Sequence, residues 1–246
     1  MQAMAMIPPS TILAFDCSAA ACSAALWRDG GNRAYRRKPM MRGHAEAMVP
    51  MILEVLADAG IRFEDLDAIA VTVGPGSFTG LRIGLSVARG IALAAAVPVI
   101  GVTTFAAVAE SISLSARLDR QTMVLLDSRR AELYCQLYSV DLAPIGAPSM
   151  SMPENLNSLL PPGKLVLAGD GVAMARAAWP NEDPLVRVIA GSGPPDAAFI
   201  GPLAARLARS GGGLPPTPIY LRAADVHTGP SGAGPAGRGR SAPAAP

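Results

Sequence analysis

The segment best suited to bind a ligand is a glycine-rich stretch, residues 74–80, which follows the apolar residues 66–73. A strand that leads through glycines into a helix leaves backbone amides and the positive end of the helix dipole facing outward, and such a site binds anions. The candidate phosphate contacts are Gly74, Gly76, Ser77 and Thr79. The stretch lacks both the Gly-Lys-Ser/Thr of a P-loop and the Gly-x-Gly-x-x-Gly of dinucleotide-binding proteins. A tight strand-to-helix turn therefore explains it about as well as a phosphate cradle.

A second candidate group is Asp16 with Ser18, at the predicted end of the first strand. Nucleotide-binding α/β proteins often keep a carboxylate at this place for the metal ion. Residues 16–21 include no glycine, however, and side chains at every position would crowd a phosphate that needs close backbone approach. We expect Asp16 to cap the amides of a turn instead. Asp127 and Asp170 follow later strands in the same way, and each alone is typical of a turn.

The histidines and cysteines predict no metal site and no catalytic group. His44 and His227 are the two histidines, and Met48 stands where a His-x-x-x-His pair would place its second ligand. Ser77 has no histidine to act as its base, and no Gly-x-Ser-x-Gly is present. The three cysteines form no Cys-x-x-Cys pair, so we expect reduced thiols and a cytoplasmic protein.

The composition indicates a folded chain without a strong preference for nucleic acid. Half of the 246 residues are hydrophobic, 4% are aromatic and the net charge is +2. Because phosphate binding needs a dense basic patch, we expect RNA to be reached only through a partner. The longest apolar run contains Arg89 and Pro98, and therefore no membrane span is predicted.

The order of the predicted elements is β-β-β-α-β-α-β, followed by a second α/β half. Three antiparallel strands followed by crossovers favour a mixed α/β sheet. We expect an N-terminal subdomain at residues 10–103, a smaller C-terminal subdomain at 104–225 and a disordered Gly/Pro-rich tail at 226–246. The true start could be Met1, Met4 or Met6.

Two helices, predicted at residues 44–59 and 79–96, are apolar on more than one side. In the second helix small residues recur every four positions, which lets another helix or a sheet approach closely. Packing within the chain and contact with another subunit are about equally consistent with this pattern. The residues proposed for a subunit interface are Met48, Met51, Ile52, Val55, Gly80, Gly84, Val87, Ala88 and Ile91.

Several segments together resemble the TsaB family of the glycoprotease-like (M22) superfamily. They are residues 12–18, 43–46, 73–84, 126–134 and 218–222, and the run 74–84, GPGSFTGLRIG, is the most specific. The resemblance implies an actin-like fold made of two mixed-sheet halves, in the ribonuclease H-like class. The first glycine-rich turn and the second histidine of the catalytic paralogue are absent here.

The resemblance also implies a function in making threonylcarbamoyladenosine beside the anticodon of tRNA. The chain would be a scaffold without a cofactor of its own, pairing with the catalytic paralogue TsaD through the helices at 44–59 and 79–96. TsaE, an ATPase, would be a third member, and ATP or ADP could bind at the shared interface. Pairing of free chains through the same helices stays open. The alternatives are an actin-fold ATPase or kinase, which would turn over ATP alone, and a glycoprotease, which would need a metal.

Overall fold

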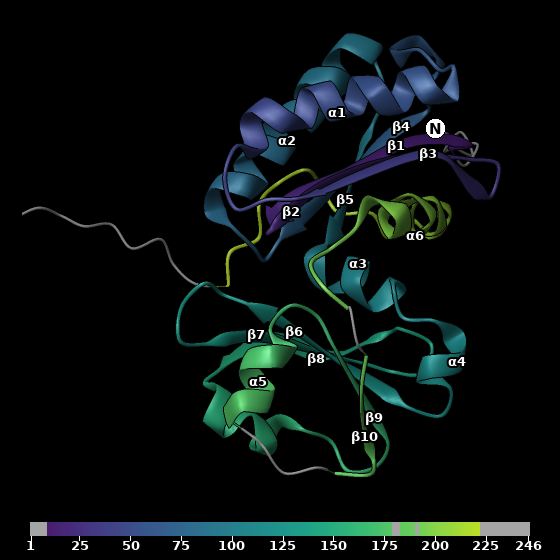
Figure 1. The fold of residues 1–246 in the computed structure, drawn as a ribbon. Coiled ribbons are helices and arrows are strands. Elements are labelled where there is room, and N and C mark those ends of the chain that lie inside the picture. The colour runs from purple at the N-terminus through teal and green to yellow at the C-terminus, as the bar shows by residue number, and fades with distance from the viewer. Residues whose placement is uncertain (1–8, 179–182, 190–191, 222–246) are drawn as a thin grey trace, which may run out of the picture.

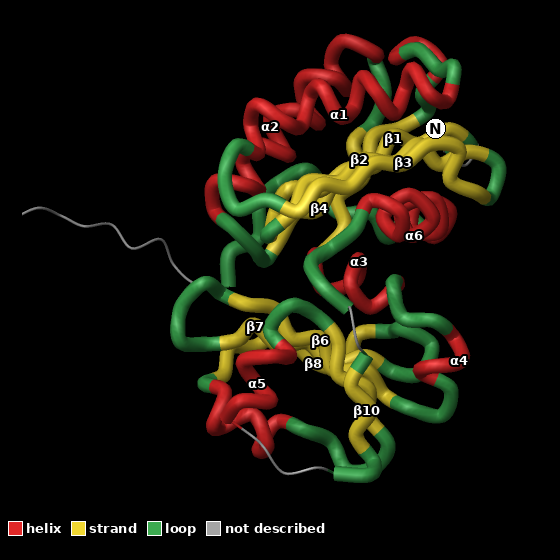
Figure 2. Tube along the Cα trace, in the orientation of Figure 1, coloured by secondary structure: helices red, strands yellow, loops and turns green. Residues whose placement is uncertain are grey.

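The first half of the chain forms a five-stranded mixed sheet. The computed structural model describes residues 9–178, 183–189 and 192–221. It has two lobes, each built on one sheet, which lie one above the other in the view of Figures 1 and 2. The first sheet has the order β3-β2-β1-β4-β5. Its strands are β1 (Thr11–Ala19), β2 (Ala21–Arg28), β3 (Gly31–Pro39), β4 (Ala68–Gly74) and β5 (Val99–Thr103). The first three are antiparallel, whereas β4 and β5 run parallel to β1, as the element order predicts.

The second half repeats this topology strand for strand. Its sheet has the order β10-β9-β6-β7-β8, with β6 in the place of β1. Strands β6 to β8 are antiparallel, and β9 and β10 are parallel to β6. The strands are β6 (Gln121–Asp127), β7 (Leu133–Tyr138), β8 (Pro144–Ser151), β9 (Leu165–Ala168) and β10 (Val186–Val188). The predicted duplicated mixed-sheet fold is therefore confirmed.

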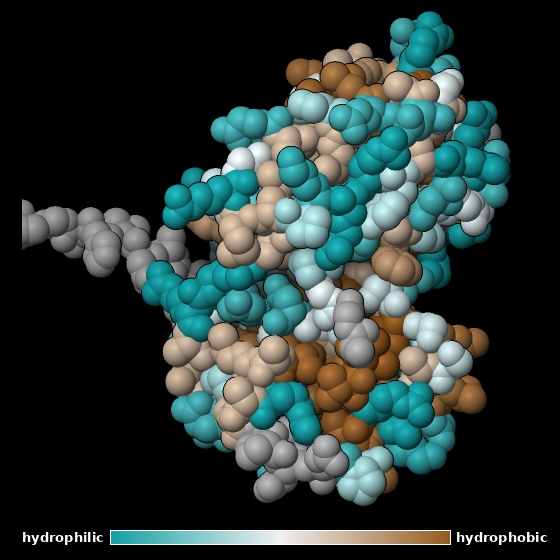
Figure 3. Space-filling view, viewed as in Figure 1, coloured by the Kyte–Doolittle hydropathy of each residue, from teal (hydrophilic) through white to brown (hydrophobic). Residues whose placement is uncertain are grey.

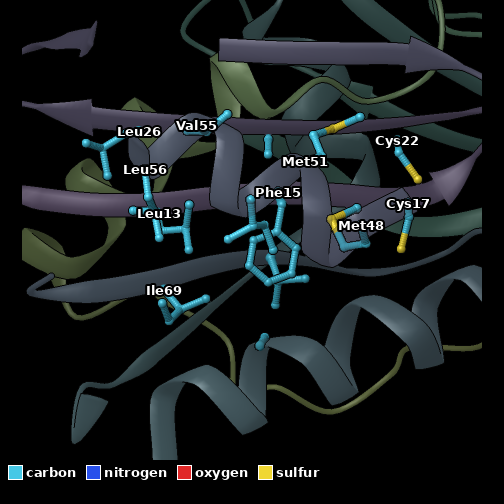
Figure 4. Close-up of a cluster of buried hydrophobic side chains, with 14 of the residues drawn as sticks. Leu13, Phe15, Cys17, Cys22, Leu26, Met48, Met51, Val55, Leu56 and Ile69 are labelled. Atoms are coloured by element: carbon cyan, nitrogen blue, oxygen red, sulfur yellow. The ribbon is translucent and has the colours of Figure 1, made fainter. Parts of the chain in front are cut away.

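The central strand β1 is buried on both of its faces. Leu13, Phe15 and Cys17 point to one face, where they meet the first helix (Figure 4). Ile12 and Ala14 point to the other face and join a separate cluster of apolar side chains. Because side chains alternate along a strand, a shift of one residue would exchange these two sets, so burial on both faces fixes the register.

Two helices cover one face of the first sheet and a third covers the other (Figure 1). Helix α1 (His44–Ala59) runs through Pro50 and ends at Gly60, and α2 (Phe78–Ala95) starts at the capping hydroxyl of Ser77. On the opposite face, α6 (Ala197–Ser210) is capped by Asp196, whose side chain accepts from the amide of Ala198. The predicted C-terminal subdomain, residues 104–225, is therefore not one compact unit, because helix α6 lies within this range and packs on the first sheet.

The remaining helices are short. They are η1 (Phe63–Asp65), α3 (Thr104–Glu110), α4 (Leu114–Arg117), η2 (Pro153–Leu159) and α5 (Val172–Ala178). The predicted tail, the alternative start methionines and Arg222 lie outside the described residues. Within the described residues, α2 alone has the length and hydropathy of a membrane span. That is weak evidence, because a helix packed on a sheet of the same chain passes the same test.

Strand β8 is an element that the sequence did not predict. Pro144, Gly146 and Pro148 interrupt the alternating pattern by which a strand is recognised in a sequence. Strand β8 lies at the edge of its sheet and pairs with β7 alone. An edge strand tolerates proline because one row of its backbone amides needs no partner in the sheet.

Candidate functional site

Asp16 lies inside strand β1 and not at its end, so its predicted place in a turn is wrong. The strand continues to Ala19 because a turn at Ala20 lets β2 pair at once. The carboxylate of Asp16 is fully buried and accepts hydrogen bonds from the hydroxyls of Ser18 (2.7 Å) and Thr72. Burial raises the pKa of Asp16 to about 6, although both hydroxyls act to lower it. Asp16 is therefore a buried carboxylate held by hydroxyl groups.

The glycine loop folds back onto the end of β1. The amide of Ser77 donates to the carbonyl of Ser18 (2.7 Å), and the Ser77 hydroxyl accepts from the amide of Gly80 (3.2 Å). A side chain at Gly76 would come within 2.7 Å of that same Ser18 carbonyl. The loop thus uses the Ser77 amide for its own packing, which supports the tight-turn interpretation. Thr79 lies apart, on the exposed side of α2.

The opposite wall of this region is a cluster of two carboxylates and one guanidinium. Arg129 lies 3.4 Å from a carboxylate oxygen of Asp127 and 3.9 Å from one of Asp170. The amide of Asp127 also donates to Asp170 (3.0 Å). Burial raises the pKa of the Asp170 carboxyl above its usual range, and Arg129 opposes that shift. The guanidinium of Arg129 is therefore paired with both carboxylates.

The cleft between these walls is nearly closed. Its cavity volume is about 10 Å³, roughly the room for one water molecule. The buried hydroxyl of Thr104, which lines it, has no hydrogen-bond partner among the described residues. The structure brings Ser18, Gly76 and Ser77 to this cleft together with Asp127, Arg129 and Asp170. In this conformation the cleft has no room for a nucleotide.

Metal-ligating side chains do not gather in one place in the described part of the chain. No group of three or more His, Cys, Asp or Glu side chains in the described part of the chain is placed to hold a metal ion. The ring of His44 contacts the carbonyl of Ala19 at 3.0 Å. Cys17, Cys22 and Cys135 are buried free thiols.

Most residues proposed for a subunit interface lie in the core of the chain instead. Met48, Met51, Ile52 and Val55 are at most 8% exposed and face the first sheet. Gly80, Gly84 and Ala88 are also buried, and a side chain at Gly80 would overlap the backbone of Cys17. For these seven residues the interface prediction is corrected, because the small-residue stripe brings α2 close to β1 and β4. Val87 and Ile91 are partly buried.

The outward side of the same two helices carries an open groove. Its cavity volume is about 500 Å³, and it is lined by Ala45, Phe78, Thr79, Arg82, Ile83, Ser86 and Val87. Apolar residues are exposed at the top of this lobe, over α1 and α2 (Figure 3). They include Val49, Leu53 and Leu93, which are 44%, 50% and 87% exposed. The exposed groove, and not the buried stripe, is therefore the surface of these helices that another molecule can reach.

One end of the groove is an aromatic corner that the sequence interpretation missed. The rings of Phe78 and Tyr220 lie 5.3 Å apart, and the guanidinium carbon of Arg82 lies 3.7 Å from the centre of the Phe78 ring. Arg82 also donates to the Tyr220 hydroxyl (3.3 Å). The spacing of Phe78 and Arg82, four residues apart, predicts that they are neighbours on a helix. Nothing local in the sequence indicates Tyr220.

The chain is similar to known proteins whose names refer to threonylcarbamoyladenosine in tRNA. Residues 38–205 match the family model described as "TsaD: tRNA N6-adenosine threonylcarbamoyltransferase". The tRNA threonylcarbamoyladenosine biosynthesis protein TsaB of Escherichia coli is 41% identical over 133 residues, 53% of this chain and 55% of that protein. The protein of the same name in Haemophilus influenzae is 36% identical over 124 residues, 50% of this chain and 52% of that protein.

Among solved structures, YeaZ from Pseudomonas aeruginosa has a TM-score of 0.74 at 30% identity. The match covers 86% of this chain and all of that one. The similarity to the two TsaB proteins, in contrast, spans about half of their length.

Proposed function

The chain belongs to the TsaB family of proteins related to tRNA N6-adenosine threonylcarbamoyltransferase, and from this premise we propose that it is a non-catalytic subunit of the machinery that makes threonylcarbamoyladenosine in tRNA. In this proposal it works in the cytoplasm, binds the catalytic paralogue TsaD as a heterodimer and meets tRNA only through that complex. The observation that carries the proposal is the exposed groove on α1 and α2, because it offers a partner a surface on the part of the chain most specific to the family.

The physical character of the groove supports binding of a helix. It is lined by the apolar side chains of Ile83 and Val87, with the small residues Ala45 and Ser86 beside them. Small residues allow close approach of a second helix, and ridges of larger ones fit between its side chains. Exposed apolar groups of this kind are typical of surfaces that bind another protein.

We further propose that the chain uses no nucleotide or metal of its own. The closed cleft supports this, and so does Arg129 between the two carboxylates that would otherwise be candidates for a magnesium ion. ATP or ADP would then bind only at a surface shared with the partner. TsaE would join the assembly as its ATPase.

The direct test is to mix the chain with the paralogue and to measure the mass and the dissociation constant in solution. We expect a heterodimer. We expect Ser86→Arg to raise its dissociation constant at least about tenfold, which corresponds to about 1.4 kcal/mol of binding free energy, since a charged side chain would then lie in the groove. Ser86 is exposed, so the substitution should not disturb folding.

The matched control is Ala94→Arg, at an exposed position on the same helix outside the groove. It should leave the dissociation constant unchanged. The proposal is wrong if no heterodimer forms, or if both variants bind as the parent chain does. Measuring the mass of the chain alone would show whether it pairs with itself.

A further inference from the structure

Arg82 is a cation at the end of an apolar groove. Within the described part of the chain, no carboxylate lies within ion-pair distance of it, whereas Arg36, Arg37 and Arg206 all have acidic partners. Its hydrogen bond is made by Nε, which donates to the hydroxyl of Tyr220. The side chain is exposed and lines the groove together with Ile83 and Val87. The charged group is therefore displayed on the groove without a carboxylate partner among the described residues.

Tyr220 belongs to a C-terminal strap, residues 214–220, that is fastened to the first sheet. Leu214 exchanges two backbone hydrogen bonds with Gly101 (2.7 and 3.0 Å), and the amide of Ile219 donates to the carbonyl of Val73 (2.7 Å). Helix α2 holds the strap as well, because Arg89 donates to the carbonyl of Pro216. The backbone of Gly74 allows this approach, since a side chain there would overlap the carbonyl of Ile219.

The strap and the aromatic corner together fix the direction of Arg82. Its guanidinium lies over Phe78 on one side, and the hydroxyl of Tyr220 holds Nε. A guanidinium placed over a ring loses less freedom on binding, and its two terminal nitrogens match the two oxygens of a carboxylate. Arginine and tyrosine are also among the residue types that dominate binding energy at protein interfaces.

We propose that Arg82 binds a carboxylate on the partner helix that occupies the groove, and that Tyr220 positions it for that contact. The inference rests on the proposed function and adds the chemistry by which the partner is recognised: an apolar helix face with an aspartate or glutamate at one end. The surroundings favour a protein carboxylate over an RNA phosphate. Arg82 is a single cation beside apolar residues, whereas phosphate backbones are bound by several cations together.

The experiment measures heterodimer dissociation constants with the purified paralogue, without RNA, at low and high salt. We expect Arg82→Gln to weaken binding about 10- to 100-fold at low salt, with a smaller difference at high salt because salt screens the ion pair. Arg82→Lys should recover part of the loss, since it keeps the charge and loses the forked geometry. Tyr220→Phe should raise the dissociation constant a few-fold, and the dissociation constant of this variant should depend on salt as that of the parent chain does. Arg120→Gln, at the residue just before strand β6 in the second half of the chain, is the control and should have no effect.

The possible outcomes distinguish a failure of the proposed function from a failure of the Arg82 contact alone. If the parent chain does not bind the paralogue at all, the proposed function and this inference fall together. If the parent binds and Ser86→Arg weakens binding, but Arg82→Gln binds like the parent chain, only the carboxylate contact is overturned. It is also overturned if Arg82→Gln leaves the heterodimer intact and lowers the affinity of the complex for tRNA, because the group bound would then be a phosphate.

Discussion

At the scale of single residues, Asp16 shows how a carboxylate that the sequence offers as a binding candidate can be part of the core. Its carboxylate is surrounded by the hydroxyls of Ser18 and Thr72 and has no cation beside it. A buried carboxylate without a cation favours its protonated form. We therefore expect Asp16 to make the stability of the chain depend on pH.

The expected pH dependence has a definite sign. The pKa of Asp16 is about 6 in the folded chain against 3.8 for the free group, so the folded state binds more protons between these values. The free energy of unfolding should therefore fall as pH rises from about 4 to about 6, by up to about 3 kcal/mol, and then stay level. Urea unfolding at several pH values would measure this, and Asp16→Asn should remove the fall.

Asp141→Asn, at an exposed position, is the control for this measurement and should keep the slope of the parent chain. An unchanged slope in Asp16→Asn would show that Asp16 is not the group that titrates. The asparagine also replaces an accepting carboxylate oxygen with a donating amide group, which changes stability to a similar extent at every pH. The slope, and not the absolute stability, is therefore the informative quantity.

At the scale of elements, helix α2 divides its two sides between different tasks. Its buried side carries the small residues that allow contact with β1 and β4, and its outward side carries the groove. The sequence pattern shows that small residues are aligned along the helix. The pattern does not show what packs against these residues, because small side chains allow a sheet and a second helix to approach equally closely.

This division changes the meaning of substitutions at Gly84. The position of a β-carbon at Gly84 is 3.4 Å from both Cys17 Sγ and Val71 Cγ2, so the remaining atoms of a leucine have no room. We expect Gly84→Leu to destabilise the chain itself by about 1–3 kcal/mol, measured by urea or thermal unfolding. Gly90→Leu is a matched control on the same helix, where a side chain meets nothing within 4 Å.

Gly90→Leu should be neutral or slightly stabilising, since leucine favours the helix over glycine. Equal stability of the two variants would contradict the placement of Gly84 against the sheet. A loss of partner binding by Gly84→Leu would by itself say nothing about the interface, because a misfolded chain also fails to bind. Ser86 and Arg82 are the positions that test the interface.

At the scale of the whole molecule, the two sheets meet at a cleft whose walls are already paired with groups of the chain. In one wall the amide of Ser77 donates a hydrogen bond to the carbonyl of Ser18. In the other wall Arg129 forms ion pairs with Asp127 and Asp170. We expect magnesium and ATP at millimolar concentration to raise the melting temperature of the isolated chain by less than about 1 °C, since a ligand stabilises only the state that binds it. Differential scanning fluorimetry would measure this.

The catalytic paralogue, measured in the same way, is the positive control for the nucleotide preparation. A shift of several degrees in the isolated chain would overturn the proposal that it has no nucleotide site. In that case Arg129→Ala would show whether the ligand uses the two carboxylates that Arg129 now pairs.

The sequence by itself determined the class of fold and the family. Alternating apolar residues in residues 66–73, helical periodicity in residues 44–59 and the run 74–84 are local signals, because each depends on neighbouring residues within one element. They predicted the mixed sheet and the helix that starts near Ser77, both of which the structure contains.

Tertiary structure alone decided which residues are exposed on the groove and which face the core. Gly80, Gly84 and Met48 have the residue types of an interface but lie against the sheet, while Arg82 and Tyr220 meet across 138 residues of chain. The physical reason is that contact between elements depends on how the chain returns in space. The return of α6 and of the strap at 214–220 to the first sheet has no local signature in the sequence.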